Sequence, residues 1–242
     1  MNKTLITSLA FLLCLASCTT KTATDKPNDS NATEKQQASA AKRNIVKKHI
    51  SIPREFTHIT NIGSVDIIFS HGDYSMEVEG DSGLIEYITT DFDCNLLTVS
   101  LKSDANPDYN IYGNDNSVKL HISAPTIKCI NICGIGGFEC TDKILEDDLQ
   151  IGMLGTGNVK LKDVESKTFL IESTGSGNIS IEHLKAETAT LNSRNEGSFT
   201  IDCDVNDFTI INAGEQQISL TGTIHTKTIY NKEDKNLQDS TK

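Results

Sequence analysis

The sequence predicts an all-β fold, a right-handed parallel β-helix or solenoid with coils of about 20 residues, preceded by antiparallel β-hairpins. Three observations predict it. Gly-x-Gly segments recur at a nearly constant period, apolar and polar residues alternate around each of them, and hairpin-like strand patterns precede the repeat. One copy of such a repeat is too short to bury a core, but stacked copies can share a continuous one.

The clearest copies of the repeat are "GMLGTGNVKL", which ends at Leu161, and "ESTGSGNISI", which ends at Ile181. A fourth copy is degraded, because Asn stands where the first glycine is expected. The copies are separated by steps of 21, 20, 20 and 19 residues, and they start at Gly134, Gly155, Gly175, Asn195 and Gly214. A period this regular indicates a stacked architecture rather than a local motif.

Four columns of the aligned copies are apolar, at six and four residues before each start and at four and six residues after it. Of these 20 positions, only Lys128 is not apolar. Alternation of this kind gives a strand one buried and one solvated face, so each copy is expected to contain two short strands around its glycine turn. The columns are Lys128, Leu149, Phe169, Ala189 and Phe208; Ile130, Ile151, Ile171, Leu191 and Ile210; Phe138, Val159, Ile179, Phe199 and Ile218; and Cys140, Leu161, Ile181, Ile201 and Leu220.

The glycines are interpreted as corner residues rather than as a phosphate cradle. A phosphate-binding loop needs a helix after its glycines, whereas a second strand follows here and the motif recurs. A corner favours glycine where it needs positive φ or a close approach of two backbones. Asn158 and Asn178 follow the glycines at one repeat position, either as a stacked amide ladder or as separate turn residues. The turn glycines are Gly134, Gly136, Gly155, Gly157, Gly175, Gly177, Gly197 and Gly214.

The first half of the chain predicts antiparallel strands. "GSVDIIFSHGDYSMEVEG" indicates a hairpin with its turn at His71 to Asp73, and "NLLTVSLKS" indicates a further strand. "GLIEYITTDF" suits either a short helix or a bent strand. In "VKLHISAP", Val118 and Leu120 match the two apolar columns that follow the glycines, so the solenoid is expected to begin near Val118. The earlier strands would then cap its open end.

The N-terminus resembles the signal peptide of a bacterial lipoprotein. Lys3 precedes the apolar run "LITSLAFLLCLA", which is too short to span a bilayer, and the run ends in the lipobox-like "LASC". Cys18 is therefore the expected lipidation site; the alternative is ordinary cleavage beside an incidental cysteine. The expected regions are a signal peptide (1–17), lipidated Cys and flexible tether (18–44), β-hairpin cap (45–117), β-solenoid (118–230) and disordered polar tail (231–242).

Charge and cysteine content limit the classes of function. After removal of the signal peptide, 21 basic and 33 acidic residues remain, which disfavours binding to nucleic acid. Cys140 stands in a core column, whereas Cys129 and Cys203 are expected to alternate outward. Cys94 and Cys133 complete an odd set of five, which gives neither a full disulfide framework nor the spacing of a zinc site. We expect no metal and no cofactor.

The chain as a whole is similar to the adhesin "head GIN" domain family of exported bacterial proteins, common among Bacteroidetes lipoproteins. The lipobox, "FTHITNIGSVDIIFSHGDYSMEVEGD", "NLLTVSL", "GTGNVKL" and "GSGNISI" carry the resemblance, whose domain part covers about Phe56 to Tyr230. It implies an all-β fold with a β-helix and a role in adhesion, and it supplies no catalytic residues. The repeats "SRNEGS" and "NAGEQQ" depart from the pattern by losing one glycine each.

The sequence therefore predicts a non-catalytic, lipid-anchored protein of the cell envelope, expected in the outer membrane, that binds a protein or glycan. The expected contact loop carries Asp108, Tyr109, Tyr112 and Asp115. Self-association through the exposed coil end is a further expectation. The alternatives are an envelope structural or sensing protein, and a polysaccharide-active β-helix enzyme using Asp163, His183, Asp202 and Asp204.

Overall fold

The computed structural model describes residues 44–102, 118–194, 196–231 and 236–242. Almost all regular structure in these residues is strand. The elements are β1 (Ile45–His49), β2 (His58–Asn61), β3 (Asp66–His71), β4 (Ser75–Asp81), the 3-10 helix η1 (Ile85–Tyr87), β5 (Ile88–Asp93), β6 (Leu96–Leu101), β7 (Lys119–Ala124), β8 (Cys129–Ile132), β9 (Phe138–Met153), β10 (Val159–Ser173), β11 (Ile179–Ser193), β12 (Ser198–Asn212), β13 (Gln217–Asn231) and β14 (Leu237–Asp239).

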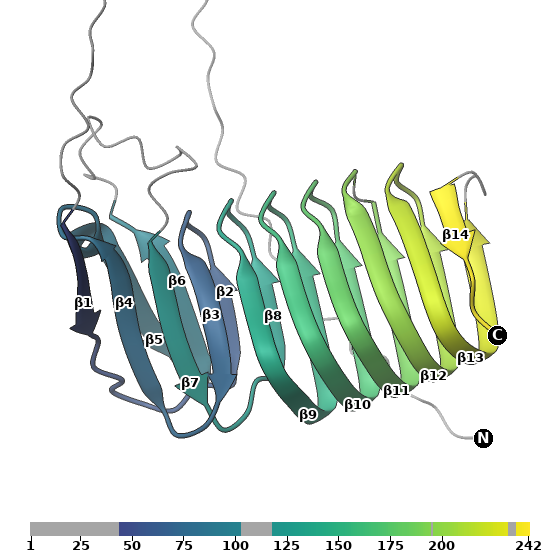
Figure 1. Ribbon diagram of the computed structural model, residues 1–242, viewed down its shortest axis with the longest axis horizontal. Helices are drawn as coiled ribbons and strands as arrows, with labels where there is room; N and C mark the ends of the chain where they lie inside the picture. The colour runs from purple at the N-terminus through teal and green to yellow at the C-terminus, as the bar shows by residue number, and fades with distance from the viewer. Residues whose placement is uncertain (1–43, 103–117, 195, 232–235) are drawn as a thin grey trace, which may run out of the picture. The chain divides into compact units, whose positions relative to one another are not determined.

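Five long strands, β9 to β13, stack side by side in chain order and form the solenoid (Figure 1). Each of them pairs in parallel with its neighbours almost from end to end. In β10, for example, Val159 lies opposite Ile179, and Ser173 lies opposite Ser193. The parallel β-solenoid that the sequence predicts is therefore confirmed. The sequence predicts two short strands in each copy, around a glycine turn. In the structure, one long strand instead runs round a bend from one glycine corner to the next.

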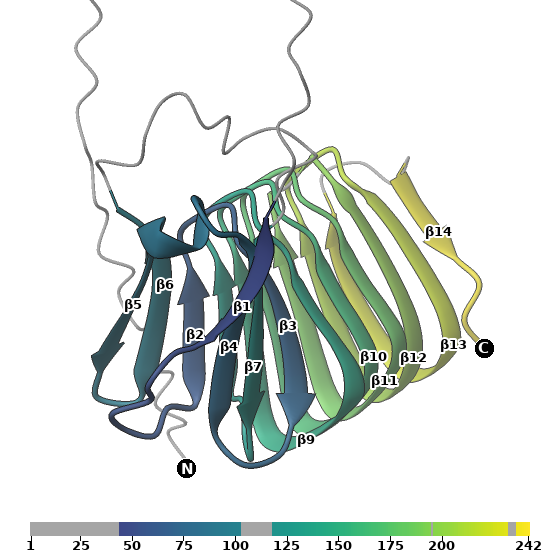
Figure 2. The same ribbon diagram turned by 60° about the vertical axis from the view of Figure 1, so that its left-hand side comes forward.

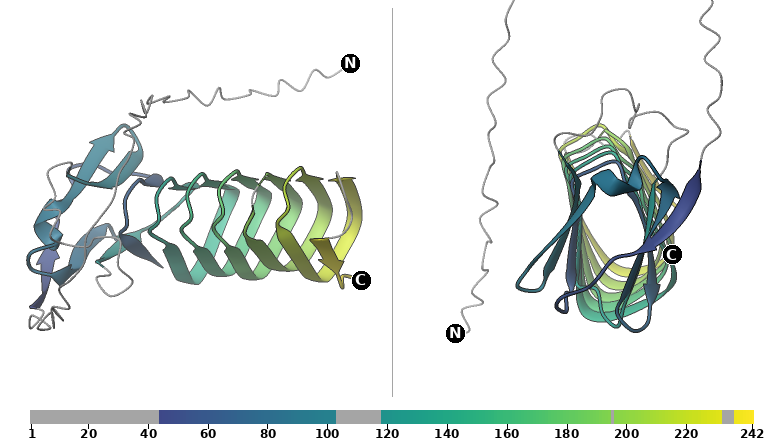
Figure 3. Two further views of the ribbon diagram at one scale, coloured as in Figure 1. Left: turned by 90° about the horizontal axis from the view of Figure 1, so that it is seen from above. Right: turned by 90° about the vertical axis from the view of Figure 1, so that its left-hand side faces the viewer.

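The core lies between the two sides of the flattened coils, as the view along the stack shows (Figure 3). The apolar columns point into it, and Phe138, Phe169, Phe199 and Phe208 are among its largest fully buried side chains. Burial of a side chain of this size contributes about 1.5 to 3 kcal/mol to folding. Because equivalent residues stack at each coil, the core is continuous along the stack rather than divided.

The first coil of the solenoid consists of β2 and β3, which the sequence analysis placed in the cap. β2 pairs in parallel with β8, and β3 pairs in parallel with β9. Ile59 lies opposite Ile130, and Ile67 lies opposite Phe138, so this coil fills the same core columns. The predicted start near Val118 is therefore wrong. The period was not visible because β4 to β7 are inserted between the first coil and the next.

The predicted hairpin of β3 and β4 is also wrong, because β7 lies between these two strands (Figure 2). β7 is parallel to β3 and antiparallel to β4. Leu120 lies opposite Ile67, and Ile122 lies opposite Phe69. The core columns of β7 are thus occupied by Leu120 and Ile122, two residues later than the expected Val118 and Leu120. β6 pairs with β2 in the same way, so β6 and β7 stack on the first coil.

Antiparallel strands close this end of the solenoid, as the sequence predicts. β5 is antiparallel to β6, β4 is antiparallel to β7, and β1 is antiparallel to β4. The segment "GLIEYITTDF" contains both of its expected alternatives, because η1 leads directly into β5. An antiparallel cap ends the parallel stack and so shields the edge of its coils.

The opposite end is partly covered by β14, which pairs in parallel with β13 through Ile218 and Leu237. The expectation of a disordered tail over 231–242 is therefore wrong for residues 236–242. Lys227 occupies the core column of Phe208, and its ammonium group pairs with the carboxylate of Asp239. This ion pair and the apolar Leu237, which packs against the core, hold the C-terminal residues on the last coil.

Candidate ligand-binding surface

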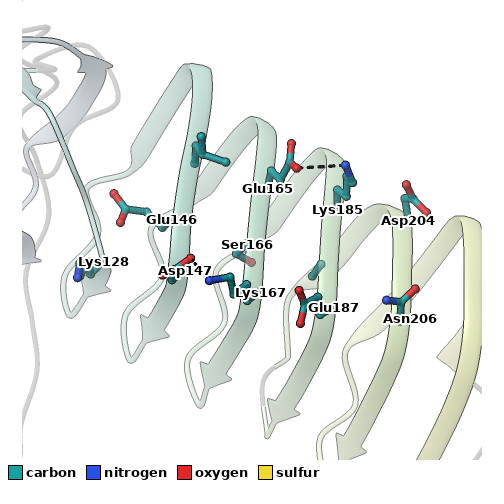
Figure 4. A pocket seen from close by; sticks show the side chains of 12 residues that line it. Lys128, Glu146, Asp147, Glu165, Ser166, Lys167, Lys185, Glu187, Asp204 and Asn206 are labelled. Atoms are coloured by element: carbon teal, nitrogen blue, oxygen red, sulfur yellow. Dashed lines mark hydrogen bonds and ion pairs between the residues drawn. The ribbon is translucent and has the colours of Figure 1, made fainter.

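An open groove of about 800 Å³ crosses the outer side of the coil bends (Figure 4). We call it the charged groove, because acidic and basic side chains make up most of its lining. The lining residues are Lys128, Leu145, Glu146, Asp147, Glu165, Ser166, Lys167, Lys185, Ala186, Glu187, Asp204 and Asn206. They come from the residue before β8 and from the bends of β9, β10, β11 and β12, so the groove runs across successive coils.

The in-register stacking places the side chains of the charged groove in rows across the strands. Glu165 lies opposite Lys185, which in turn lies opposite Asp204. The charges in this row alternate in sign from coil to coil. Because parallel pairing brings equivalent residues together, a row of like charges would destabilise the stack. The alternation therefore supports the register of the coils.

Ion pairs between neighbouring coils fix several of these side chains. Glu165 accepts a hydrogen bond from Lys143 at 2.6 Å and another from Lys185 at 3.1 Å, and Lys167 pairs with Asp147 at 2.7 Å. The hydrogen bond from Lys143 is the main reason why the pKa of Glu165 is lowered, and the bond from Lys167 lowers the pKa of Asp147 in the same way. Both groups are negatively charged near neutral pH, whereas a catalytic general acid needs a raised pKa.

Two carboxylates of the charged groove remain available to a ligand. Glu187 and Asp204 are exposed and have no ion-pair partner among the described residues. Glu146 is different, since its Oε1 accepts hydrogen bonds from the Thr126 hydroxyl and from the Ile127 amide, at 2.9 Å for the latter. Glu146 thus fastens the connection between β7 and β8. The free carboxylates can bind ammonium, guanidinium or hydroxyl groups of a ligand.

Three of the four residues considered for catalysis, Asp163, His183 and Asp202, lie in one row across adjacent coils at the surface. The Nδ1 atom of His183 lies 3.1 Å from Asp202, whose other oxygen accepts a hydrogen bond from Thr221 at 2.6 Å. Asp163 lies opposite His183 on the neighbouring strand, and its carboxylate is 4.0 Å from the ammonium group of Lys143. The His183 side chain is 71% exposed, so it is a surface side chain that links adjacent coils. Asp204 lines the charged groove.

The glycine corners are stacked backbone on backbone. A β-carbon on Gly155 would lie 1.9 Å from the carbonyl oxygen of Gly134, and one on Gly175 would lie 1.9 Å from that of Gly155. Among the described glycines, only Gly222 has positive φ. Of the two reasons given for glycine at the corners, the structure therefore shows the close approach. Similar contacts involve Gly134, Gly136, Gly157, Gly177 and Gly197, whereas the amide of Gly214 donates to the side chain of Asn212 at 3.1 Å.

Asn158 and Asn178 form the amide ladder that was one of the two sequence alternatives. The Nδ2 group of Asn178 donates to Oδ1 of Asn158 at 2.9 Å, and its own Oδ1 accepts from the amide of Ser198 at 2.9 Å. The ladder runs along the outside of the corners. It ties successive coils together at the point where the chain turns.

All five cysteines in the described residues are free thiols. Cys140 is buried, as predicted. Cys129 and Cys203 are buried as well, so the expectation that they point outward is wrong; Cys203 lies two residues after the buried Ile201 and continues its inward alternation. Burial raises the pKa of Cys140 to about 11 and that of Cys203 to about 12. Thiols in this state are poor nucleophiles and metal ligands.

Two of the predicted sites fall outside the described residues. These are the lipidation site Cys18 and the contact loop with Asp108, Tyr109, Tyr112 and Asp115. The charged groove, by contrast, was missed in the sequence. The signal that could have found it is the alternation of charge sign at the repeat period, as in Glu165, Lys185 and Asp204.

Neither a metal centre nor a membrane-spanning helix is found in the part of the chain that the structure describes. None of its groups of His, Cys, Asp and Glu could hold a metal ion. It contains no helix with the length and apolar character needed to cross a membrane.

Comparison with known proteins places the fold in a family. The family model described as "Putative auto-transporter adhesin, head GIN domain" matches residues 55–182, more than half of the chain. The chain belongs to the head GIN domain family. The matched range contains β2 to β10, and so most of the cap and the first coils of the solenoid; the recognised family therefore includes both parts of the fold. Among curated proteins, none matches the sequence.

Solved structures share this head GIN fold at low sequence identity. A putative adhesin from Bacteroides fragilis has a TM-score of 0.62 at 18% identity, covering 78% of this chain and 94% of that one. A putative adhesin from Parabacteroides merdae has a TM-score of 0.58 at 20% identity, with coverages of 76% and 85%. A putative lipid binding protein from Parabacteroides distasonis has a TM-score of 0.57 at 19% identity, with coverages of 81% and 97%. The family and two of these neighbours are thus described as adhesins rather than enzymes.

Proposed function

We propose that this protein is a non-catalytic, lipid-anchored binding module of the bacterial cell envelope, with adhesion as its role. Membership of the head GIN family is the observation that carries the proposal. The charged groove supports it, because the groove is a broad open surface that crosses several coils rather than an enclosed pocket. A surface of this kind suits an extended macromolecule better than a small substrate.

The chemistry of the charged groove also favours binding over catalysis. Its carboxylates with shifted pKa values, Asp147 and Glu165, are held in the ionised state by lysines. Glycoside hydrolysis needs one carboxyl group with a raised pKa to protonate the leaving oxygen. The unpaired Glu187 and Asp204 instead provide fixed negative charge for a partner with ammonium or guanidinium groups.

The anchor is proposed from the sequence, where "LASC" ends the signal and Cys18 would carry the lipid. Residues 19–42 contain no large apolar side chain, so they would serve as a tether that separates the domain from the membrane. Lipidation predicts that the protein sediments with membranes. Substitution Cys18→Ser should release it into the soluble fraction, and retention of this variant in the membrane fraction would contradict the anchor.

Adhesion is tested by expressing the protein in cells that lack it and measuring their retention on immobilised mucin and on neighbouring bacterial cells. The double variant Glu187→Lys/Asp204→Lys should lower retention to the level of cells without the protein. The control Asp91→Lys/Asp93→Lys makes the same change in net charge on β5 and should retain adhesion. If cells with and without the wild-type protein are retained equally, a structural or sensing role in the envelope replaces adhesion.

A further inference from the structure

A second surface of the solenoid differs from the charged groove in chemistry. Between the bends and the glycine corners, the outer side of β10 to β13 carries threonine side chains at equivalent positions. We call this surface the threonine face. It comprises Thr168, Thr188, Thr190, Thr209, Thr226 and Thr228, all of which are exposed or partly exposed.

The threonines lie in two rows that run across the strands. In one row Thr168 lies opposite Thr188, and in the other Thr190 lies opposite Thr209, which lies opposite Thr228. Adjacent rungs of a row are about 4.8 Å apart, and alternate residues along one strand are about 6.6 Å apart. The face is therefore a regular two-dimensional array of hydroxyl and methyl groups.

The hydroxyl groups of one row of this array are free to bind, whereas that of Thr188 in the other row donates to the carbonyl oxygen of Lys167 at 3.4 Å. Those of Thr190, Thr209 and Thr228 have no hydrogen-bond partner among the described residues. Threonine is β-branched and has few χ1 rotamers, so the hydroxyls are held in nearly fixed directions by a rigid sheet. A preorganised array loses little conformational entropy when it binds a ligand.

The threonine face is nearly uncharged in a protein whose net charge is −11. Its two rows on β10 to β13 contain one charged side chain, Asp207, which lies opposite Thr188. A second, Glu172, lies beside the rows on β10, opposite Asn192. Beside the rows, Ile211 lies opposite Tyr230, and the Tyr230 side chain is 62% exposed. An exposed aromatic ring next to ordered hydroxyls is amphipathic, and it offers one flat apolar surface and several polar contacts.

We propose that the threonine face binds a neutral polysaccharide whose chain lies across the coils, along the solenoid axis. Such a polymer repeats hydroxyl groups and apolar C–H faces at a spacing close to that between neighbouring strands. It carries no charge, and so it matches this face and not the charged groove. The inference rests on the proposed binding role but assigns it a second, separate surface and a ligand class.

The proposal is tested by cosedimentation of the purified protein with three insoluble neutral glycans, namely cellulose, chitin and β-1,3-glucan. The wild type should be depleted from solution by at least one of them. The variant Thr190→Lys/Thr209→Lys should bind that glycan at least about tenfold more weakly, because it places two charges in the array. The control Ser180→Lys/Thr200→Lys makes the same change on the opposite side of the same coils and should bind like the wild type.

Thermal unfolding of each variant shows whether it is folded before its binding is compared. The proposal is overturned if the wild type binds none of the three glycans, or if both folded variants bind equally. Either result would leave groove-dependent adhesion of cells unaffected. Conversely, glycan binding that depends on Thr190 and Thr209 in a protein that does not support adhesion would overturn the proposed function alone.

Discussion

The carbonyl oxygen of Gly134 lies 1.9 Å from the position that a β-carbon on Gly155 would occupy. Real β-carbons do not approach a carbonyl oxygen so closely, so any other residue at Gly155 must push two coils apart. The same relationship joins Gly155 to Gly175. The repeated glycines therefore set how closely the coils can stack at their corners.

The variant Gly155→Ala should accordingly lower the free energy of unfolding by about 2 to 4 kcal/mol, because its β-carbon meets backbone that cannot easily move. Gly63→Ala is the matched control. Gly63 stacks under Gly134, yet the nearest atom to its own β-carbon would be Leu101 Cγ at 3.4 Å, an ordinary contact. Denaturant unfolding of both variants checks the prediction, and equal losses of stability would contradict it.

The amide ladder should contribute measurably to stability. Asn178→Ala removes the donor to Asn158 and the acceptor for Ser198, which should cost about 1 to 2 kcal/mol of unfolding free energy. Asn178→Asp keeps an acceptor and loses the donor, so its loss should be smaller. Chemical denaturation measures both. A ladder without energetic value would leave the two variants as stable as the wild type.

Small and large side chains alternate in one core column. Ala189 lies opposite Phe169 in β10 and opposite Phe208 in β12. Ala189→Leu should therefore overpack the column and lower the unfolding free energy by about 1 to 3 kcal/mol. The exposed Thr188→Leu is the control and should change it by less than about 0.5 kcal/mol. Stabilisation by Ala189→Leu would show that the core has unfilled space there.

The contact of Asp239 with Lys227 predicts a dependence on pH. Burial raises the pKa of Asp239, but hydrogen bonds from Lys227 and Thr241 outweigh this effect, so the pKa is lowered in the folded state. The contribution of Asp239 to stability is then present above the unfolded value of about 3.9 and is lost as the pH falls through the lower folded value.

Asp239→Asn removes this titration. The difference in unfolding free energy between the wild type and Asp239→Asn should be constant from pH 7 to about pH 5 and should shrink below about pH 4. Urea unfolding at a series of pH values measures it. A difference that stays constant down to pH 2 would show that the ion pair does not couple to folding.

The reactivity of each cysteine thiol should depend on how deeply it is buried. Cys94 is exposed, whereas Cys140 and Cys203 are buried with pKa values raised to about 11 and about 12. Iodoacetamide at pH 8 should therefore modify Cys94 in the native protein and modify the two buried thiols only after unfolding. Peptide mass spectrometry identifies the modified residues. Rapid native labelling of Cys203 would contradict its place in the core.

The part of the fold that could be predicted is the part where local pattern and tertiary contact coincide. In the repeat, Ile171 and Leu191 are one period apart in the sequence and lie opposite each other on adjacent strands. The period of the sequence therefore predicts the register of the strands. The first coil has no such regularity, because Ile59 pairs with Ile130 across the inserted strands β4 to β7. No local sequence pattern shows where the chain rejoins the stack after such an insertion.

The β3–β4 hairpin was wrong for a related reason. "HGD" is a good turn signal, and the chain does reverse direction between β3 and β4. A turn signal does not show, however, whether a third strand lies between the two strands that the turn connects. β7 enters there, and Ile122 occupies the place beside Phe69. The charged groove was not predicted, because each of its residues taken singly looks like an ordinary solvated surface residue. Only the stacking of Glu165 against Lys185 makes them a surface.

Protease shaving of intact cells, with a periplasmic protein as the control, tests most directly whether the protein is an adhesion module of the cell surface. The account predicts that the protease removes the domain from intact cells while the periplasmic control survives, because residues 19–42 would be an exposed tether. Protection of the domain until the outer membrane is opened would contradict adhesion and leave an envelope structural or sensing role.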